Sequence, residues 1–191
     1  MRKKDNDKRI ALLDSTLALV NEKGFQAAPM SEIAKNAGVS PATIYLFFKN
    51  KEDMINTLYV ELKANLGINA FKEYKVGMPV KEGFELIWNN IARFRLKEPN
   101  ESAFLTQCDN TPMINEKSRL EGTEHLRPLF DLWQRGQSEG SIKPLSLYLI
   151  YAYTLTPFPF LMQSQKRKKY SLNTENLKHA FEAGWDAIKV Q

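Results

Sequence analysis

The sequence predicts an all-α protein in which an N-terminal helix-turn-helix domain of three helices is joined by a long helix to a larger helical domain. The first observation is the period of the apolar residues: Ile10, Leu13, Leu17 and Val20 recur every three or four positions, as they do on a helix face. The second is that no run of alternating apolar and polar residues marks a set of strands. The third is that Gly and Pro divide the helical pattern into separate segments.

Each early helix has a start or a stop signal. Gly24 follows the first helix at the point where a left-handed backbone is common, and Pro29 suits the first turn of the second helix. The third helix covers residues 41–48, with Ser40 as its N-cap and Pro41 at its first position. Asn50 caps a long fourth helix with acidic residues in its first turn.

The rest of the chain continues the helical period up to the C-terminus. Proline lacks the N–H that a helix interior needs, so we expect distortion wherever one falls inside such a pattern. The predicted helices cover residues 84–99, 103–108, 115–139 with a kink at Pro128, 144–165 with a bend or break at Pro157 and Pro159, and 173–189.

Length and composition allow one or two compact domains. The 191 residues are 43% apolar with ordinary Gly and Pro usage, so a buried core is expected and fibrous or low-complexity chains are excluded. The single cysteine, Cys108, cannot form an internal disulfide, and the basic N-terminus leads into no apolar signal segment. We therefore expect a cytoplasmic protein.

The positive charge is concentrated near the N-terminus. Residues 1–51 hold nine Lys and Arg against five Asp and Glu, a balance of +4, whereas residues 52–191 hold 18 against 17. A basic front part predicts contact with a polyanion such as nucleic acid, and a solvated basic tail is the alternative. The residues Arg2, Lys3 and Lys4 are either a disordered tail or an arm that reaches a minor groove.

One uncharged stretch, residues 144–165, is followed directly by the basic run Lys166–Lys169. That order resembles a membrane span with a basic flank. Its hydroxyl groups and two prolines make it less apolar than a spanning helix, so we expect a buried helix and no membrane contact. A membrane-associated helical interaction protein remains an alternative.

The second and third helices, joined by the turn Ala37-Gly38-Val39-Ser40, form a helix-turn-helix, in which the second of the two helices lies in the major groove of DNA. Hydroxyls and ammonium groups there suit phosphates, and apolar side chains suit thymine methyl groups. Positions 40–48 hold no Arg, Asn or Gln, so direct base readout is expected to be thin. The candidate DNA contacts are Ser40, Pro41, Ala42, Thr43, Tyr45, Leu46, Phe47, Lys49 and Lys51.

About a dozen positions in residues 8–60 bring a family resemblance in one unbroken register. They are Gly24-Phe25, Ile33-Ala34, Ala37-Gly38-Val39-Ser40, Thr43, Tyr45, Phe48 and Lys51. In this region the chain resembles the N-terminal domain of tetracycline-repressor-like (TetR) transcriptional regulators. It departs from residues common in that family at Pro29, Ala42 and Phe47, so a relative's operator sequence does not transfer.

The resemblance implies a DNA-binding domain at residues 1–50 and an effector-binding and dimerisation domain at residues 51–191. It also implies a homodimer that binds a palindromic operator on double-stranded DNA, and whose last two helices form a four-helix bundle with those of the second copy. A repressor of this kind is released from DNA by a small molecule. A helix-turn-helix regulator without an effector is the alternative.

Two further sets of residues follow from these expectations. For a hydrophobic or aromatic effector, the pocket candidates share an apolar or aromatic side chain on the C-terminal helices, and packing in the core is their alternative role. They are Phe84, Trp88, Ile91, Phe104, Cys108, Phe130, Trp133 and Tyr151. The candidate dimer residues lie on the last helix, with packing inside the chain as the alternative. They are Ala180, Phe181, Gly184, Trp185 and Ile188.

The sequence does not favour an enzyme. His125 and His179 are far apart and lack the spacing of metal ligands, and Cys108 has no nearby histidine in sequence. No Gly-rich phosphate loop or nucleophile elbow is present, and no cofactor or metal is expected.

Overall fold

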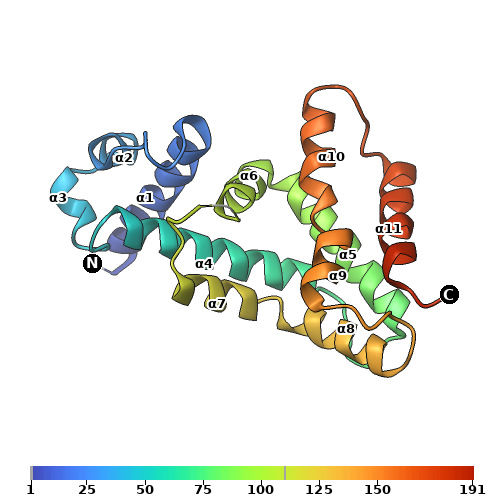
Figure 1. Ribbon diagram of the computed structural model, residues 1–191. Helices are drawn as coiled ribbons and strands as arrows, with labels where there is room; N and C mark the ends of the chain where they lie inside the picture. Colours follow the sequence, from blue (N-terminus) through green and yellow to red (C-terminus); the bar gives the residue numbers. More distant parts are fainter. Residues whose placement is uncertain (1, 110) are drawn as a thin grey trace. The chain divides into compact units, whose positions relative to one another are not determined.

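The computed structural model describes residues 2–109 and 111–191, and within them the regular secondary structure is entirely helical (Figure 1). This confirms the predicted all-α class. An isolated antiparallel bridge joins Ile142 to Lys189. The helices are α1 Arg2–Lys23, α2 Met30–Asn36, α3 Pro41–Ile44, α4 Lys51–Ala70, α5 Val80–Lys97, α6 Pro99–Cys108, α7 Glu116–Glu124, α8 Arg127–Ser138, α9 Leu147–Thr154, α10 Pro157–Lys166 and α11 Thr174–Ile188.

The chain forms two compact units. Unit 1 contains residues 1–64 and 99–122, and unit 2 contains residues 65–98 and 123–191. The sequence suggested a division after residue 50, whereas the compact units divide inside α4 and unit 1 also takes in α6 and α7. The functions given to the two parts of the chain remain predictions.

Unit 1 is built on α1, which packs against both α2 and α6. Gly24 and Gly38 adopt φ values of 81° and 67°, so the turn after α1 and the turn between α2 and α3 use glycine where a left-handed backbone is required. The ring of Phe104 in α6 packs against that of Phe25 in a tilted arrangement, with the ring centres 5.8 Å apart. Unit 1 is thus more than the helix-turn-helix, because α6 completes its core.

An amide network adds polar contacts between α1 and α6. The Nδ2 of Asn21 donates to the carbonyl of Asn100 at 2.8 Å, and Nε2 of Gln107 donates to Oδ1 of Asn21 at 2.9 Å. The side-chain amide of Asn21 thus uses both its donor and its acceptor on α6, which fixes the register of the two helices.

Unit 2 holds an aromatic core made by α5, α8, α10 and α11. Phe84 of α5 lies 5.6 Å from Trp133 and 5.5 Å from Phe181, measured between ring centres. Trp88, one turn further along α5, lies 5.8 Å from both Phe158 and Phe181. Edge-to-face and tilted pairs of this kind stabilise a core beyond the area that they bury.

The uncharged stretch is broken into α9 and α10, as the two prolines predicted. Pro157 has no N–H to donate, so the helix cannot continue through it. The indole Nε1 of Trp88 donates to the carbonyl of Thr154 at 2.9 Å and so satisfies an acceptor at the end of α9. Among the described residues, no helix is long and apolar enough to cross a membrane.

Three local expectations were wrong. The third helix ends at Ile44 and continues as a turn, in which the N–H of Phe47 bonds to the carbonyl of Ile44 at 2.9 Å. Residues 115–139 form two helices rather than one kinked helix, because Pro128 stands in the first turn of α8 and a turn precedes it. The N-terminal segment is not a disordered tail, since α1 begins at Arg2; the side chains of Arg2 and Lys3 lie outside the described residues.

Candidate nucleic-acid interface and ligand site

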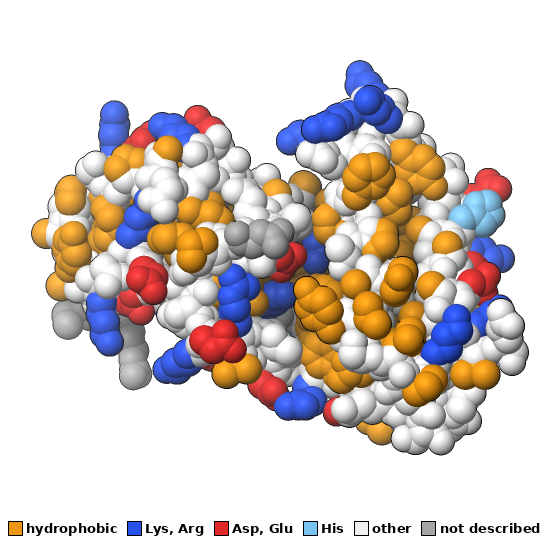
Figure 2. Space-filling model, in the orientation of Figure 1, with side chains coloured by type: hydrophobic (Ala, Val, Ile, Leu, Met, Phe, Trp, Pro, Cys, Tyr) orange, Lys and Arg blue, Asp and Glu red, His pale blue; other side chains and the backbone are white. Residues whose placement is uncertain are grey.

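The segment around α3 presents an apolar face to solvent. Tyr45 is 63% exposed and Leu46 is 78% exposed, and Pro41 and Ala42 are also exposed. Ile44 and Phe48 on the opposite side are buried, which anchors the segment in unit 1. Figure 2 shows the hydrophobic side chains at this end of unit 1. An exposed apolar cluster held by a fixed backbone is typical of a contact surface.

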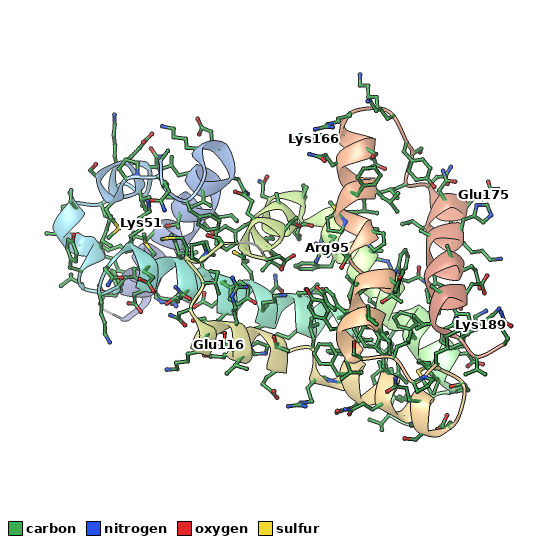
Figure 3. All side chains as sticks on the ribbon, in the orientation of Figure 1. Lys51, Arg95, Glu116, Lys166, Glu175 and Lys189 are labelled. Atoms are coloured by element: carbon green, nitrogen blue, oxygen red, sulfur yellow. The ribbon has the colours of Figure 1, made fainter. Side chains whose placement is uncertain are left out.

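The hydroxyl and ammonium groups predicted to contact DNA differ in how available they are to a phosphate. The hydroxyls of Ser40 and Thr43 bond to each other at 2.9 Å, and the Lys49 side chain is exposed. Nζ of Lys51 instead lies 3.3 Å from the carbonyl of Gln26, to which it donates, and burial lowers the pKa of Lys51 (Figure 3). Lys49 is therefore the candidate cation that is most available to a phosphate.

A reciprocal cap fixes the start of α4. Oδ1 of Asn50 accepts from the backbone N–H of Asp53 at 2.8 Å, and Oδ2 of Asp53 accepts from the backbone N–H of Lys49 at 2.8 Å. Both bonds satisfy N–H groups near the helix end, as in a capping box. The cap holds the backbone of Lys49 and so positions the end of the α3 segment.

Phe47 is half-buried, and its ring lies 6.4 Å from that of Phe48. The guanidinium of Arg9 in α1 lies 5.8 Å from the centre of the Phe48 ring. Packing accounts for one side of Phe47, and the other side remains accessible. All nine predicted DNA-contact residues thus lie in one continuous segment of unit 1, with Thr43, Phe47 and Lys51 half-buried and the others exposed.

The predicted pocket residues are divided between the two units. Phe104 and Cys108 belong to α6 in unit 1, and the other six belong to α5, α8 and α9 in unit 2. In unit 2, Phe84, Trp88, Ile91 and Trp133 are buried, while Phe130 and Tyr151 are half-buried. These residues make up much of the aromatic core, which is the alternative role that the sequence left open.

Cys108 is fully buried in unit 1. Burial and the neighbouring carboxylate of Asp109 raise the pKa of its thiol to about 12. A thiol in this state is a poor nucleophile and a poor metal ligand. The described residues also hold no group of three or more His, Cys, Asp or Glu that could bind a metal ion.

A polar groove of about 420 Å³ lies in unit 1, lined by residues of α4, of α7 and of the loop before α7. Its charged residues are Asp53, Glu61, Lys117 and Glu121. None of the predicted pocket residues lines it, and its acidic character does not suit the apolar effector that the sequence predicted.

The last helix turns most of its predicted dimer residues inward. Phe181, Gly184, Trp185 and Ile188 are buried inside unit 2, where α11 packs on α5 and α9, and Ala180 is half-buried. Their burial favours the packing inside the chain that the sequence left open. The physical reason is that Phe181 and Trp185 stand four residues apart on one face of α11, and their rings complete the aromatic core against α5.

Another apolar face was missed by the sequence reading. Leu149, Tyr153, Pro157 and Phe160 are all exposed and follow one another at intervals of four, four and three residues. Figure 2 shows hydrophobic side chains over α9 and α10. Within α9 the spacing places Leu149 and Tyr153 on one face, and within α10 it places Pro157 and Phe160 on one face. Both pairs could have been found in the uncharged stretch. On α11, Ala180, Ala183 and Ala187 repeat with the same period and are half-buried or exposed.

Comparison with known proteins places both parts of the chain in one family. Residues 12–58 match the family described as "Bacterial regulatory proteins, tetR family", and residues 79–189 match "Tetracyclin repressor-like, C-terminal domain". The chain belongs to the TetR family of transcriptional regulators. The predicted helix-turn-helix domain and family are therefore confirmed.

Proteins that match nearly the whole of this chain are also described as transcriptional regulators. A regulator of Haemophilus influenzae, described as an uncharacterized HTH-type transcriptional regulator, is 26% identical over 99% of this chain and 100% of its own. A TetR-family regulator of Marinobacter aquaeolei has a solved structure that matches with a TM-score of 0.93, 26% identity and complete coverage of both chains. The Bacillus subtilis regulator FadR, solved with stearoyl-CoA, matches with a TM-score of 0.72 and 24% identity over 94% of this chain and 98% of its own.

Proposed function

We propose that this TetR-family regulator is a homodimeric, cytoplasmic repressor that binds a palindromic DNA operator through the α3 segment and is released by a small hydrophobic effector. The observation that carries the DNA part is the exposure of Tyr45 and Leu46 on a segment whose other side is anchored by Ile44 and Phe48. An enzymatic role has no support in the catalytic groups that the sequence offers.

The DNA contacts divide by chemistry. Lys49 and the hydroxyls of Ser40, Thr43 and Tyr45 suit phosphate oxygens. Leu46, Ala42 and Pro41 can pack on thymine methyl groups but cannot form bidentate hydrogen bonds with bases. Lys51, held by the Gln26 carbonyl, positions the start of α4 and contributes little to phosphate binding.

The dimer surface is proposed to be the exposed face of α9 and α10, together with the small residues of α11. Leu149, Tyr153, Pro157 and Phe160 supply the apolar stripe, and Ala183 lets a second helix approach. This places the contact on the side of α11 away from Phe181 and Trp185. A two-fold axis then sets the two α3 segments about one turn of DNA, roughly 34 Å, apart or somewhat more.

The effector part rests on unit 2. Six of the eight pocket candidates gather in its aromatic core, and FadR, which shares the fold, was solved with stearoyl-CoA. Residues 65–70 at the end of α4 belong to unit 2, where Nδ2 of Asn90 in α5 donates to the carbonyl of Ala70 at 3.2 Å. An apolar ligand that repacks the core around α5 is proposed to act on α4 through this end. The ligand would thereby shift the population away from the dimer geometry that fits both half-sites.

The first experiment is selection of bound sequences from random duplex DNA with purified full-length protein, followed by a salt titration on the enriched site. We expect an enriched palindrome, whose affinity falls steeply with salt because phosphate contacts release counterions. Recovery of no motif, with only weak salt-sensitive binding, contradicts the proposed operator recognition. A Leu46→Ala variant with unchanged sequence preference contradicts the assigned contact.

The packing of the candidate pocket residues on one another also favours a second function, a DNA-binding regulator that has no small-molecule effector. A thermal-unfolding screen with apolar compounds separates the two. Ligand-induced stabilisation supports the first function, because a ligand that binds only the folded state raises the melting temperature. No stabilisation by any apolar compound supports the second.

A further inference from the structure

The core of unit 2 contains one polar group that is out of keeping with its surroundings. Trp133 is fully buried, and its indole Nε1 has no hydrogen-bond partner. Among the described residues it is the one buried side-chain nitrogen or oxygen without a partner. Leaving such a donor unpaired in an apolar core is costly, so native proteins rarely do so without a ligand, water or functional reason.

A second tryptophan shows that the same core can satisfy this group. Trp88 is also buried, and its Nε1 donates to the carbonyl of Thr154 at 2.9 Å. Both indoles pack against Phe84 or Phe181 of the same aromatic core. The unpaired donor is therefore specific to Trp133 and not a general property of tryptophan in this unit.

The surroundings of Trp133 restrict the acceptor that could pair with it. Its ring lies 5.6 Å from that of Phe84 and 5.8 Å from that of Phe130, measured between ring centres. A carboxylate paired with this indole would be a buried charge against aromatic rings, with a neutral N–H as its partner. Burying such a charge costs far more than one neutral hydrogen bond returns, whereas a neutral carbonyl carries no such penalty.

We propose that Trp133 is the hydrogen-bonding anchor of a ligand site in unit 2 that takes the neutral carbonyl of an apolar ester or thioester. The inference rests on the effector part of the proposed function and adds the ligand class and the residue that selects it. The apolar chain of the ligand packs against the aromatic core, and its carbonyl oxygen accepts from Nε1. A free fatty acid is disfavoured because its head is charged at neutral pH.

Phe130 is the more exposed of the two rings against Trp133. Phe84 is fully buried and Phe130 is half-buried. The proposal assigns the approach of the ligand to the Phe130 side, because this ring can move without displacing the central ring of Phe84.

The test follows the three indole N–H signals of the full-length protein by nitrogen-15 NMR, assigned with single Trp→Phe variants. The probes are methyl decanoate, decanoic acid and decane, which share an apolar chain and differ in the head group. With the ester we expect a downfield shift of the Trp133 signal and no comparable shift of the Trp88 signal, which is already hydrogen-bonded.

The matched variants are Trp133→Phe and Trp185→Phe, because Trp185 is the tryptophan outside the candidate pocket residues. The ester is expected to bind Trp133→Phe about tenfold more weakly than the wild type, since its carbonyl loses the indole donor. Trp185→Phe, if folded, keeps the ester affinity. If Trp133→Phe does not fold, the wild-type indole signal still decides the question.

The outcomes separate this inference from the proposed function. If decane and the ester bind equally well, or if the Trp133 indole signal does not move in the ester complex, Trp133 is not the hydrogen-bonding anchor. Either result is still compatible with an apolar effector site. Binding of the acid in preference to the ester overturns the ligand class. If none of the three probes binds, both the anchor and this effector class fall, while operator binding, measured separately on the same protein, is unaffected.

Discussion

The two units carry their candidate sites in opposite ways. In unit 1 the predicted DNA contacts are consecutive in sequence, lie on one short segment and expose apolar side chains such as Leu46. In unit 2 the candidate ligand residues come from α5, α8 and α9 and are mostly buried among other rings. An apolar side chain exposed to solvent can reveal a surface site. A ligand pocket inside a core is lined by the same residue types as the core, so residue type alone does not reveal it.

The two units differ in net charge, and this difference is not apparent from the order of charged residues along the chain. Unit 1 has 12 Lys and Arg against 12 Asp and Glu and is neutral, while unit 2 has 15 against 10 and carries the whole excess of +5. The basic balance of residues 1–51 is offset by acids of α4 and of residues 99–122, which fold into the same unit. We therefore expect DNA binding by unit 1 to depend on local cations such as Lys49 rather than on the net charge of the unit.

The largest expected effect tests which aromatic residues of unit 2 are core. Phe181→Ala should lower the free energy of unfolding by about 3–5 kcal/mol, because it empties a fully buried ring site against Phe84 and Trp88. The measurement is chemical denaturation at fixed protein concentration. The matched control is Phe160→Ala, whose ring is 69% exposed.

For Phe160→Ala we expect little loss of monomer stability but weaker self-association in sedimentation velocity, since its ring belongs to the proposed dimer face. The reverse pattern, with Phe181 controlling association and Phe160 controlling stability, would show that the two faces of the C-terminal helices have been exchanged.

Cys108 tests the buried part of unit 1. With the thiol pKa raised to about 12, the thiolate fraction near pH 8.5 is expected to be at least about a hundredfold lower than in the unfolded chain. Alkylation by iodoacetamide, followed by mass spectrometry, should therefore be slow in the folded protein and fast in denaturant. Equal rates in the two states would mean that α6 does not shield the thiol.

The raised pKa of the Cys108 thiol also makes the stability of the protein depend on pH. The folded state keeps a proton that the unfolded chain releases as the pH rises through about 9. Because the unfolded state then binds fewer protons, stability falls between that pH and about 12. A Cys108→Ala variant should lose this part of the pH dependence while keeping the rest.

The sequence predicted unit 1 better than unit 2 because the helix-turn-helix depends on short-range signals. Gly24 and Gly38 mark the turns, Asn50 marks the start of α4, and Ile44 and Phe48 show the buried side of α3 four residues apart. Each signal lies within a few residues of the feature that it predicts, so no knowledge of tertiary packing was needed.

The C-terminal helices required information that is not local. Phe160 and Phe181 are the same residue type on neighbouring helical segments, yet one is exposed and the other lies in the core. Only the packing of α11 on α5 and α9 decides between them. The missing partner of Trp133 is likewise invisible in the sequence, because it depends on what surrounds the indole in three dimensions.

A smaller effect tests the exposed face of unit 1. Leu46→Ala should leave the free energy of unfolding within about 0.5 kcal/mol of the wild type, because its side chain is mostly exposed. Its affinity for the selected operator should fall about tenfold, as expected for the loss of an apolar contact with a base. Fluorescence anisotropy with a labelled duplex measures the effect.

The control for Leu46→Ala is Lys49→Gln. It should weaken binding to specific and non-specific duplexes alike and reduce the salt slope by about one, because a phosphate contact carries no sequence information. A loss confined to the specific site would mean that Lys49 contacts a base edge, and the division between phosphate contacts and apolar base contacts would have to be redrawn.

The smallest effect concerns the cap that holds the DNA-binding segment in place. Asn50→Ala removes the bond from Asn50 to the Asp53 N–H and should cost about 1 kcal/mol of stability. An Asn50→Ser variant, which can still cap, should recover most of it. If the cap also positions α3, operator affinity should follow stability across the two variants, because a loosened first turn of α4 weakens the hold of the Asp53 carboxylate on the backbone N–H of Lys49. Stability that changes without any change in affinity would show that the α3 segment is positioned by Ile44 and Phe48 alone.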